Sequence, residues 1–228
     1  MLTGEEQENK EQERPPIETV IFDLDGLLID SEVVWNRAYY KFIEMKSLPH
    51  EPVVSAQFVG KGLKEIIQLW QERYGLKGNK DKLLEEYRNV FYDILFNSEN
   101  FRLMDGAEEL IKSLDGRYKL AVATGGHTQE KCSQILKNLG LGSYFEVVAS
   151  SDDVKEGKPA PDLYLDVAKR LGVSPSVCLA LEDSANGVLS AKRAGMQVFA
   201  INPEPPLRDE LEKQHPEKVL SSLREVQL

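Results

Sequence analysis

The chain has 228 residues, of which 41% are hydrophobic and 29% are charged, and its formal net charge is −10. This length suffices for one full domain plus a small insert, and the composition is ordinary for a soluble globular protein. An acidic surface repels nucleic-acid phosphates and anionic lipid, so we expect neither nucleic acid nor a membrane as a main partner. A phosphorylated substrate is repelled as well, so a phosphate site in this chain requires local cations or a metal ion.

Cysteine content and the first residues bear on the compartment. Cys132 and Cys178 lie far apart and belong to no CxxC or Cys/His cluster, so we expect two reduced, buried thiols, which fit the cytoplasm best. The chain starts with acidic and polar residues, unlike a signal peptide. No apolar run approaches the roughly 18 residues of a membrane span. We therefore expect a cytoplasmic protein, and we expect it to be a monomer.

Residues 1–16 are predicted to form a disordered tail. They are mostly Glu, Gln, Asn and Lys, and they end in Pro15-Pro16. Such a segment cannot bury enough apolar surface to offset the entropy lost when it becomes ordered.

The folded part is predicted to begin at Ile17, with a short β-branched strand that leads directly into Asp23. Between Ser31 and about Asn97 the apolar residues follow a helical period, and no convincing strand interrupts them. We therefore predict an all-helical insert over residues 31–100 with its own small core. The apolar positions that share a helical face are Val33, Val34, Ala38, Phe42 and Ile43, then Leu63, Ile66, Ile67 and Trp70, then Leu83, Leu84, Tyr87, Val90, Phe91 and Ile94.

After Phe101 the pattern alternates between helices and strands. Strands alternating with helices of this length predict right-handed crossovers and a parallel sheet. The fold class is therefore α/β, with a Rossmann-like core formed by residues 17–30 and 101–228 and the helical insert placed after the first strand. Helices are predicted over 107–114, 129–139, 162–171 and 185–194, and strands over 119–124, 146–149, 177–181 and 197–201.

Polar residues follow three of the predicted strands. The first strand ends in Asp23 and Asp25, and residues two apart in an extended segment point the same way, so both carboxylates can face one site. Another ends in Thr124 followed by two glycines, where a hydroxyl and backbone N–H groups can bind phosphate oxygens. A third ends in Glu182-Asp183, whose oxygens suit Mg²⁺. Because ligands of open α/β sheets bind at the carboxyl ends of strands, we expect these groups to meet there.

Lys158 lies in the run Gly157-Lys158-Pro159-Ala160-Pro161, between a glycine and two prolines. The stiff backbone of this run allows the lysine to supply a fixed positive charge to a phosphate or to a nucleophile. Each motif alone is a weak signal, since acidic residues after strands are often turn or cap residues. The four motifs in this chain order are far more specific.

With these motifs the chain resembles the haloacid dehalogenase-like hydrolase superfamily, and most of all the subgroup of β-phosphoglucomutase and small sugar-phosphate or nucleotide phosphatases. The resemblance covers about residues 17 to 222. The residues that carry it are Phe22-Asp23-Leu24-Asp25-Gly26 with Asp30-Ser31-Glu32, Thr124-Gly125-Gly126, Gly157-Lys158-Pro159-Ala160-Pro161-Asp162, and Leu181-Glu182-Asp183-Ser184-Ala185-Asn186-Gly187.

The resemblance implies a role for each matching residue. Asp23 would attack phosphorus and form an aspartyl-phosphate. Asp25 would protonate the leaving oxygen and later deprotonate water. Thr124 and Lys158 would hold the phosphoryl group. Relatives commonly carry Ser or Asn where this chain has Gly125-Gly126, so here the backbone at Gly125 would bind the phosphate in place of a polar side chain.

The resemblance also implies a metal ion and a cap. Mg²⁺ would be bound by Asp23, by the backbone carbonyl of Asp25, by Asp183 and by Glu182 as a further ligand. The helical insert corresponds to the small α-helical cap of the family, whose closure excludes water and selects the substrate. Within it we expect Lys61, in a loop between two glycines, to contact the leaving group; an exposed loop lysine without function is the alternative.

Other chemistries of the superfamily fit less well. Dehalogenases need neither a second acid two residues after the nucleophile nor Mg²⁺, so Asp25 argues for phosphoryl transfer. Phosphonate hydrolysis would need a lysine of the cap that forms a Schiff base with the substrate. Lys41 and Lys46 are the candidates, but lysines on helix surfaces are mostly solvated, which disfavours this reaction. A protein that keeps the fold but only senses a metabolite is disfavoured because all four motifs retain their chemically essential residues.

We therefore predict a magnesium-dependent phosphatase that acts on a small phosphomonoester such as a sugar, polyol or nucleoside phosphate. The alternative is a sugar-phosphate mutase similar to β-phosphoglucomutase. Trp35 stands where the mutases of this group carry a histidine, which favours hydrolysis. Whether Trp35 faces the substrate or belongs to the core of the cap is left open.

Overall fold

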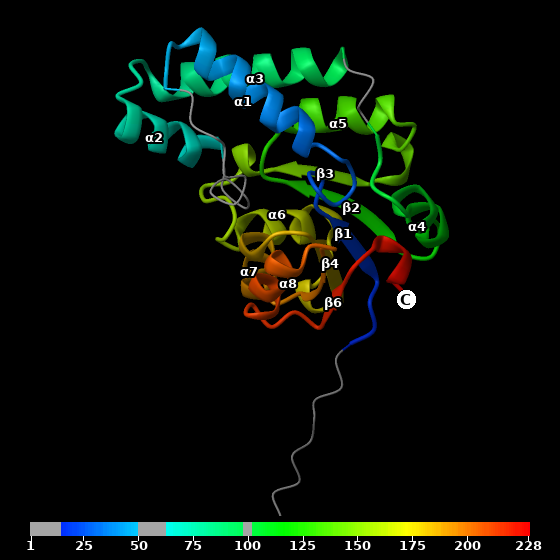
Figure 1. The fold of residues 1–228 in the computed structure, drawn as a ribbon. Helices are drawn as coiled ribbons and strands as arrows, with labels where there is room; N and C mark the ends of the chain where they lie inside the picture. The colour runs from blue at the N-terminus through cyan, green and yellow to red at the C-terminus, as the bar shows by residue number, and fades with distance from the viewer. Residues whose placement is uncertain (1–14, 50–62, 98–101) are drawn as a thin grey trace, which may run out of the picture.

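The computed structural model describes residues 15–49, 63–97 and 102–228 of the chain. Its strands form one six-stranded parallel sheet in the order β3-β2-β1-β4-β5-β6 (Figure 1). The predicted α/β class with a Rossmann-like parallel sheet is therefore confirmed. The strands are β1 (Thr19–Phe22), β2 (Lys119–Thr124), β3 (Val147–Ser150), β4 (Cys178–Glu182), β5 (Gln197–Ile201) and β6 (Lys218–Leu220).

Helices cover both faces of the sheet because the side chains of a buried strand point alternately to either face. Val20 and Phe22 of β1 pack in one apolar cluster with α4 and α5, whereas Ile21 packs in another with α6 and α7. The helices of this part are α4 (Ala107–Leu114), α5 (Gln129–Asn138), α6 (Asp162–Leu171), α7 (Ala185–Arg193) and α8 (Pro205–Glu212). Each predicted helix and strand of the core is present with ends that differ by at most one residue.

Two elements near the C-terminus are missing from the prediction, namely α8 and β6. Helix α8 begins with two prolines, which signal a loop in a sequence but are tolerated in the first turn of a helix, where no N–H is needed. Strand β6 has only three residues, is not fully buried and lies at the edge of the sheet. It is therefore too short to show a strand period.

The described part of residues 31–100 contributes three helices, which lie together beyond the carboxyl ends of the strands (Figure 1). Their apolar faces meet around the buried Trp70, whose ring stacks on Phe42 with the ring centroids 5.6 Å apart and meets Tyr87 edge-on. No strand occurs in the described part of 31–100, as expected. The helices are α1 (Glu32–Met45), α2 (Leu63–Tyr74) and α3 (Lys80–Phe96).

The register of the sheet brings the predicted motifs to one edge. Phe22, the last residue of β1, pairs with Val122 of β2 and with Leu181 of β4. Asp23 therefore emerges beside Glu182, and Thr124 ends the neighbouring strand two residues past Val122. None of the helices in the described part of the chain has the length and apolar character that crossing a membrane requires.

Candidate active site

The turn after β1 places Asp23 and Asp25 at the edge of the sheet. It is closed by backbone hydrogen bonds, among them the one from the N–H of Gly26 to the carbonyl of Ile29 at 2.9 Å. Gly26 has φ +77°, and a Cβ at this position would lie 2.2 Å from Oδ2 of Asp183. The turn thus requires glycine twice, for its backbone conformation and for the close approach of the third motif.

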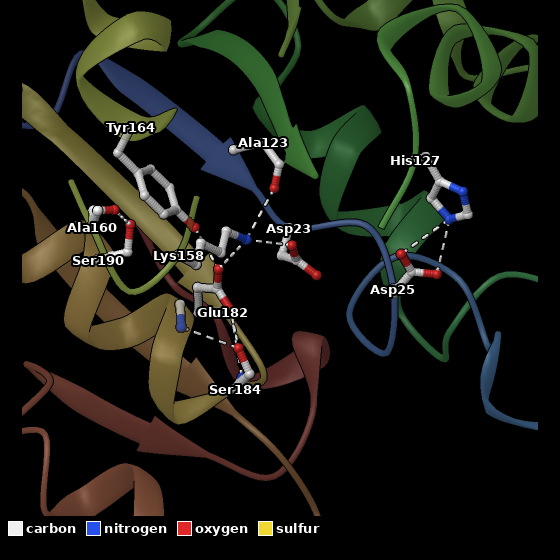
Figure 2. Close-up of polar contacts among 11 residues, drawn as sticks. Asp23, Asp25, Ala123, His127, Lys158, Ala160, Tyr164, Glu182, Ser184 and Ser190 are labelled. Carbon is white, nitrogen blue, oxygen red and sulfur yellow. Dashed lines mark hydrogen bonds and ion pairs between the residues drawn. The ribbon is translucent and has the colours of Figure 1, made fainter. Parts of the chain in front are cut away.

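Lys158 joins the first and third motifs (Figure 2). Its ammonium donates to Oδ1 of Asp23 at 2.5 Å, to Oε1 of Glu182 at 2.6 Å and to the carbonyl of Ala123 at 3.1 Å. Burial alone would lower the pKa of Lys158, but the neighbouring carboxylates of Asp23 and Glu182 outweigh it and raise that pKa. Lys158 is therefore a fixed positive charge beside the predicted nucleophile.

Glu182 is fully buried and held on both oxygens. Besides Lys158, the hydroxyl of Tyr164 donates to Oε1 at 2.6 Å, and the hydroxyl of Ser184 donates to Oε2 at 3.2 Å (Figure 2). A Cβ on Gly187 would come within 2.0 Å of this carboxylate, so the first turn of α7 also closes around it. Sequence reasoning missed Tyr164: the helical period predicts only that it faces the core, whereas its contact with Glu182 depends on how α6 docks on the sheet.

Three carboxylates surround one point at this edge. Asp23, Glu182 and Asp183 each offer an oxygen, and these oxygens lie within 4.8 Å of one another. Burial raises the pKa of Asp23 to about 8, with Glu182 and Asp25 adding to the shift and Lys158 opposing it. Burial, followed by Asp23 and Glu182, also raises the pKa of Asp183. One ammonium does not compensate for these negative charges, and a cluster of buried carboxylate oxygens suits a hard divalent cation.

Thr124 ends β2 fully buried, and its hydroxyl has no hydrogen-bond partner in the described part of the chain. Ser151, the residue after the adjacent β3, also has a buried hydroxyl without a partner in the described part of the chain, and a Cβ on Gly125 would lie 3.8 Å from it. Buried hydroxyls in native proteins normally have a partner. These two hydroxyls, next to the glycines of the second motif, are therefore suited to the oxygens of a bound phosphoryl group.

Asp25 is held by two side chains whose contact with it the sequence did not reveal. Nε2 of His127 lies 3.1 Å from Oδ1 and 3.0 Å from Oδ2, and the indole Nε1–H of Trp35 donates to Oδ1 at 3.2 Å (Figure 2 shows the histidine). Burial raises the pKa of Asp25, but His127, Ser31 and Trp35 together outweigh it and lower that pKa. His127 directly follows the second motif, and that position was the available signal.

Trp35 packs in the core of the helical layer and also contacts Asp25 of the site. Its ring packs against Phe91 with centroids 3.9 Å apart and stacks on Tyr87, so it belongs to the helical layer. It also reaches Asp25, and a Cβ on Gly126 would lie 3.1 Å from its ring. Gly126 thus leaves the room that the indole fills.

Three lysines of the helical insert were singled out from the sequence, and the structure describes two of them. Lys61 lies outside the described residues. Lys41 pairs with Asp93 at 2.9 Å on the surface, and Lys46 pairs with Glu86. Lysines that are engaged in ion pairs on the helical layer are poor candidates for a Schiff base, so phosphonate hydrolysis finds no support in them.

Comparison with known proteins is consistent with this geometry. The family model described as haloacid dehalogenase-like hydrolase matches residues 20–201. A phosphorylated carbohydrates phosphatase of Thermotoga maritima is 34% identical over 221 residues, covering 92% of this chain and 100% of that protein. Hexitol phosphatase B of Escherichia coli is 34% identical, covering 90% and 92%. The structure of CbbY from Rhodobacter sphaeroides in complex with phosphate has a TM-score of 0.78 and 26% identity, covering 92% and 96%.

Proposed function

The chain belongs to the haloacid dehalogenase-like hydrolase family and is a phosphatase, and we propose that it hydrolyses a small phosphomonoester, a sugar, polyol or nucleoside phosphate, with Asp23 as the nucleophile. The observation that carries this proposal is the position of Asp23, which contacts Lys158 and forms a cluster of carboxylates with Glu182 and Asp183. The unpartnered hydroxyl of Thr124 supports it from the neighbouring strand.

The residues suffice for a two-step reaction. In the first step a carboxylate oxygen of Asp23 forms a bond to phosphorus, the ester P–O bond breaks, and Asp25 gives its proton to the leaving oxygen. In the second step Asp25 takes a proton from water, whose oxygen forms a bond to phosphorus while the aspartyl P–O bond breaks. Lys158 and the hydroxyl of Thr124 hold the phosphoryl oxygens through both steps.

The acidic cluster is the proposed Mg²⁺ site. Asp23, Glu182 and Asp183 would hold the ion together with the backbone carbonyl of Asp25, because carboxylate and carbonyl oxygens are the ligands Mg²⁺ prefers. When bound, Mg²⁺ supplies positive charge that offsets the negative charge of the phosphoryl group. This local charge answers the problem that an overall acidic protein poses for an anionic substrate.

We further propose that residues 31–100 act as a cap over the core formed by 17–30 and 101–228. Contacts across the two parts support this role. Arg88 of α3 pairs with Asp152 of the core at 2.5 Å, and the hydroxyl of Tyr92 lies 3.0 Å from Nδ1 of His127. A layer in this place can exclude bulk water from the aspartyl-phosphate site while it selects the leaving group.

Mg²⁺ is expected to raise the melting temperature, and more so at about pH 8.5 than at about pH 6. The pKa of Asp23 is about 8 in the folded metal-free protein, whereas the ordinary value of 3.8 applies to the unfolded chain. Between these values the folded state binds more protons than the unfolded state, so metal-free stability falls as pH rises through this window. Protons compete with Mg²⁺ for the same oxygens at the lower pH.

Thermal melts with and without MgCl₂ at the two pH values measure this effect. Asp183→Asn should lose most of the Mg²⁺-dependent rise, whereas Asp166→Asn, on the outer part of α6, should keep it. An Mg²⁺-dependent rise of equal size at both pH values would contradict protonation of the proposed ligands.

The substrate class is tested by incubating the purified protein with a panel of sugar, polyol and nucleoside phosphates and with p-nitrophenyl phosphate, in the presence and absence of Mg²⁺. We expect Mg²⁺-dependent release of inorganic phosphate from some members of the panel. Formation of glucose 6-phosphate from β-glucose 1-phosphate without free phosphate would instead identify the mutase alternative. Hydrolysis requires water to reach the aspartyl-phosphate, whereas a mutase passes the phosphoryl group to a second sugar hydroxyl.

A further inference from the structure

We propose that His127 is a positioning residue for the acid/base steps: its imidazole fixes the direction of the Asp25 carboxylate, and the hydroxyl of Tyr92 on α3 fixes the imidazole. The proposal rests on the proposed function, because it assumes that Asp25 transfers protons. It assigns a task to a histidine that sequence reasoning did not include in the site.

His127 contacts both Asp25 and Tyr92. Its side chain is fully buried between two polar partners. Nε2 lies 3.1 Å and 3.0 Å from the two oxygens of Asp25, and Nδ1 lies 3.0 Å from the hydroxyl of Tyr92. Both ring nitrogens of this buried imidazole are therefore engaged, as expected for a polar group that water does not reach.

One tautomer of His127 satisfies the hydrogen bonding of Asp25, His127 and Tyr92 together. An ionised carboxylate only accepts hydrogen bonds, so Nε2 of His127 carries the hydrogen that points to Asp25. In a neutral ring Nδ1 is then the acceptor, and the hydroxyl of Tyr92 donates to it. When Asp25 is protonated, one of its oxygens can still accept from Nε2 while the other directs its hydrogen to the substrate.

The imidazole is also packed among aromatic side chains. Trp35 and Phe91 approach the imidazole with ring centroids 5.7 and 5.3 Å away. The backbone is held as well, since the hydroxyl of Ser150 donates to the carbonyl of His127 at 2.5 Å. The indole of Trp35 adds a second donor to Oδ1 of Asp25, so the carboxylate is oriented from the core and from the helical layer together.

Orientation of an acid matters most where the leaving group needs a proton. An alkyl phosphate expels a poor leaving group and depends on the acid, whereas p-nitrophenyl phosphate expels a stable phenolate and hardly does. General acid–base catalysis contributes about 10²- to 10⁴-fold, and a misdirected acid loses part of this. The ratio of kcat/KM between the two esters therefore reports on Asp25, because kcat/KM covers the steps up to cleavage of the ester bond.

The experiment compares kcat/KM for the best alkyl phosphate and for p-nitrophenyl phosphate in holoenzyme with Mg²⁺. His127→Phe, which keeps the ring but removes the donor, should lose about 10²-fold on the alkyl ester and less than about 5-fold on the aryl ester. His127→Gln, whose amide N–H can replace Nε2, should recover at least about tenfold on the alkyl ester. Tyr92→Phe should show the same selective loss, reduced to about threefold to tenfold.

Tyr118→Phe is the control, because it removes a tyrosine hydroxyl directly before β2, at the opposite end of this strand from Thr124, and its ratio between the esters should equal that of the wild type. An unchanged ratio in His127→Phe, whether both rates fall or neither does, would overturn the positioning role. If that variant does not fold, an unchanged ratio in Tyr92→Phe overturns it instead. Failure of the proposed function looks different, because the wild type would then hydrolyse neither ester.

Discussion

Asp23→Asn is expected to lower phosphatase turnover by about 10⁴-fold or more on every substrate, because an amide does not attack phosphorus. The substitution keeps the shape of the side chain, and the amide oxygen can still accept from the ammonium of Lys158, which now donates to Oδ1 at 2.5 Å. The loss should therefore appear in kcat, as expected when the covalent intermediate cannot form.

The fold of this variant should survive, and the pH dependence of its stability tests the site independently of activity. Burial raises the pKa of Asp23 to about 8, so ionising this group costs stability in the metal-free protein. Asparagine removes that charge. The melting temperature of metal-free Asp23→Asn should therefore equal or exceed that of the wild type near pH 8.5, and the difference should shrink towards lower pH, where Asp23 is protonated.

Asp30→Asn provides the matched control for this experiment. Asp30 lies after the same turn but points to Arg102, with a carboxylate-to-guanidinium distance of 2.8 Å at an exposed position. Exposed ion pairs contribute at most about 1 kcal/mol. We expect its turnover to stay within about twofold of the wild type. Turnover of Asp23→Asn at the wild-type level would refute Asp23 as the nucleophile.

The elements that could be read from the sequence are those whose pattern is local. A buried parallel strand is a short apolar run, and Val20, Ile21 and Phe22 show this directly. Helix α6 ends at Gly172, which adopts φ 69° as a helix-stopping glycine does. Because parallel strands all end at one edge, chain order alone predicted that the residues after β1, β2 and β4 lie close to one another.

The contacts that could not be read depend on how separate elements dock. His127 meets Asp25 because β1 and β2 are neighbours, and its second partner, Tyr92, comes from a helix in the insert. Nothing in the spacing of these residues encodes the position of α3 over the sheet. The contact of Tyr164 on α6 with Glu182 could not be predicted either, because a helical period predicts a buried face and not a hydrogen-bond partner.

Lys158→Met is expected to lower both activity and stability. The ammonium bridges Asp23 and Glu182 from a side chain that is only 10% exposed. Without it the buried carboxylates lose the cation that pairs with them, and breaking a buried ion pair from one side costs about 3–5 kcal/mol. Turnover should fall by about 10²- to 10³-fold, because a charge that stabilises the transferred phosphoryl group is gone.

The loss of stability in this variant should depend on pH in a definite direction. Lys158 opposes the rise in the pKa of Asp23, so its removal moves that pKa above its wild-type value of about 8. The folded variant then binds more protons than the unfolded chain over a wider range, and its stability falls further as pH rises through that range. Urea unfolding of metal-free protein should therefore show a larger difference from the wild type near pH 8.5 than near pH 6.

Mg²⁺ distinguishes this electrostatic explanation from a simple packing defect. A divalent cation among Asp23, Glu182 and Asp183 supplies positive charge that the variant lacks, so added Mg²⁺ should restore part of the lost stability near pH 8.5 without restoring turnover. Lys155→Met, an exposed residue of the same loop, should change neither quantity. A loss in Lys158→Met that is independent of pH and unaffected by Mg²⁺ would mean that the lysine stem, and not its charge, stabilises the fold; the ammonium would then have no special part in holding the nucleophile.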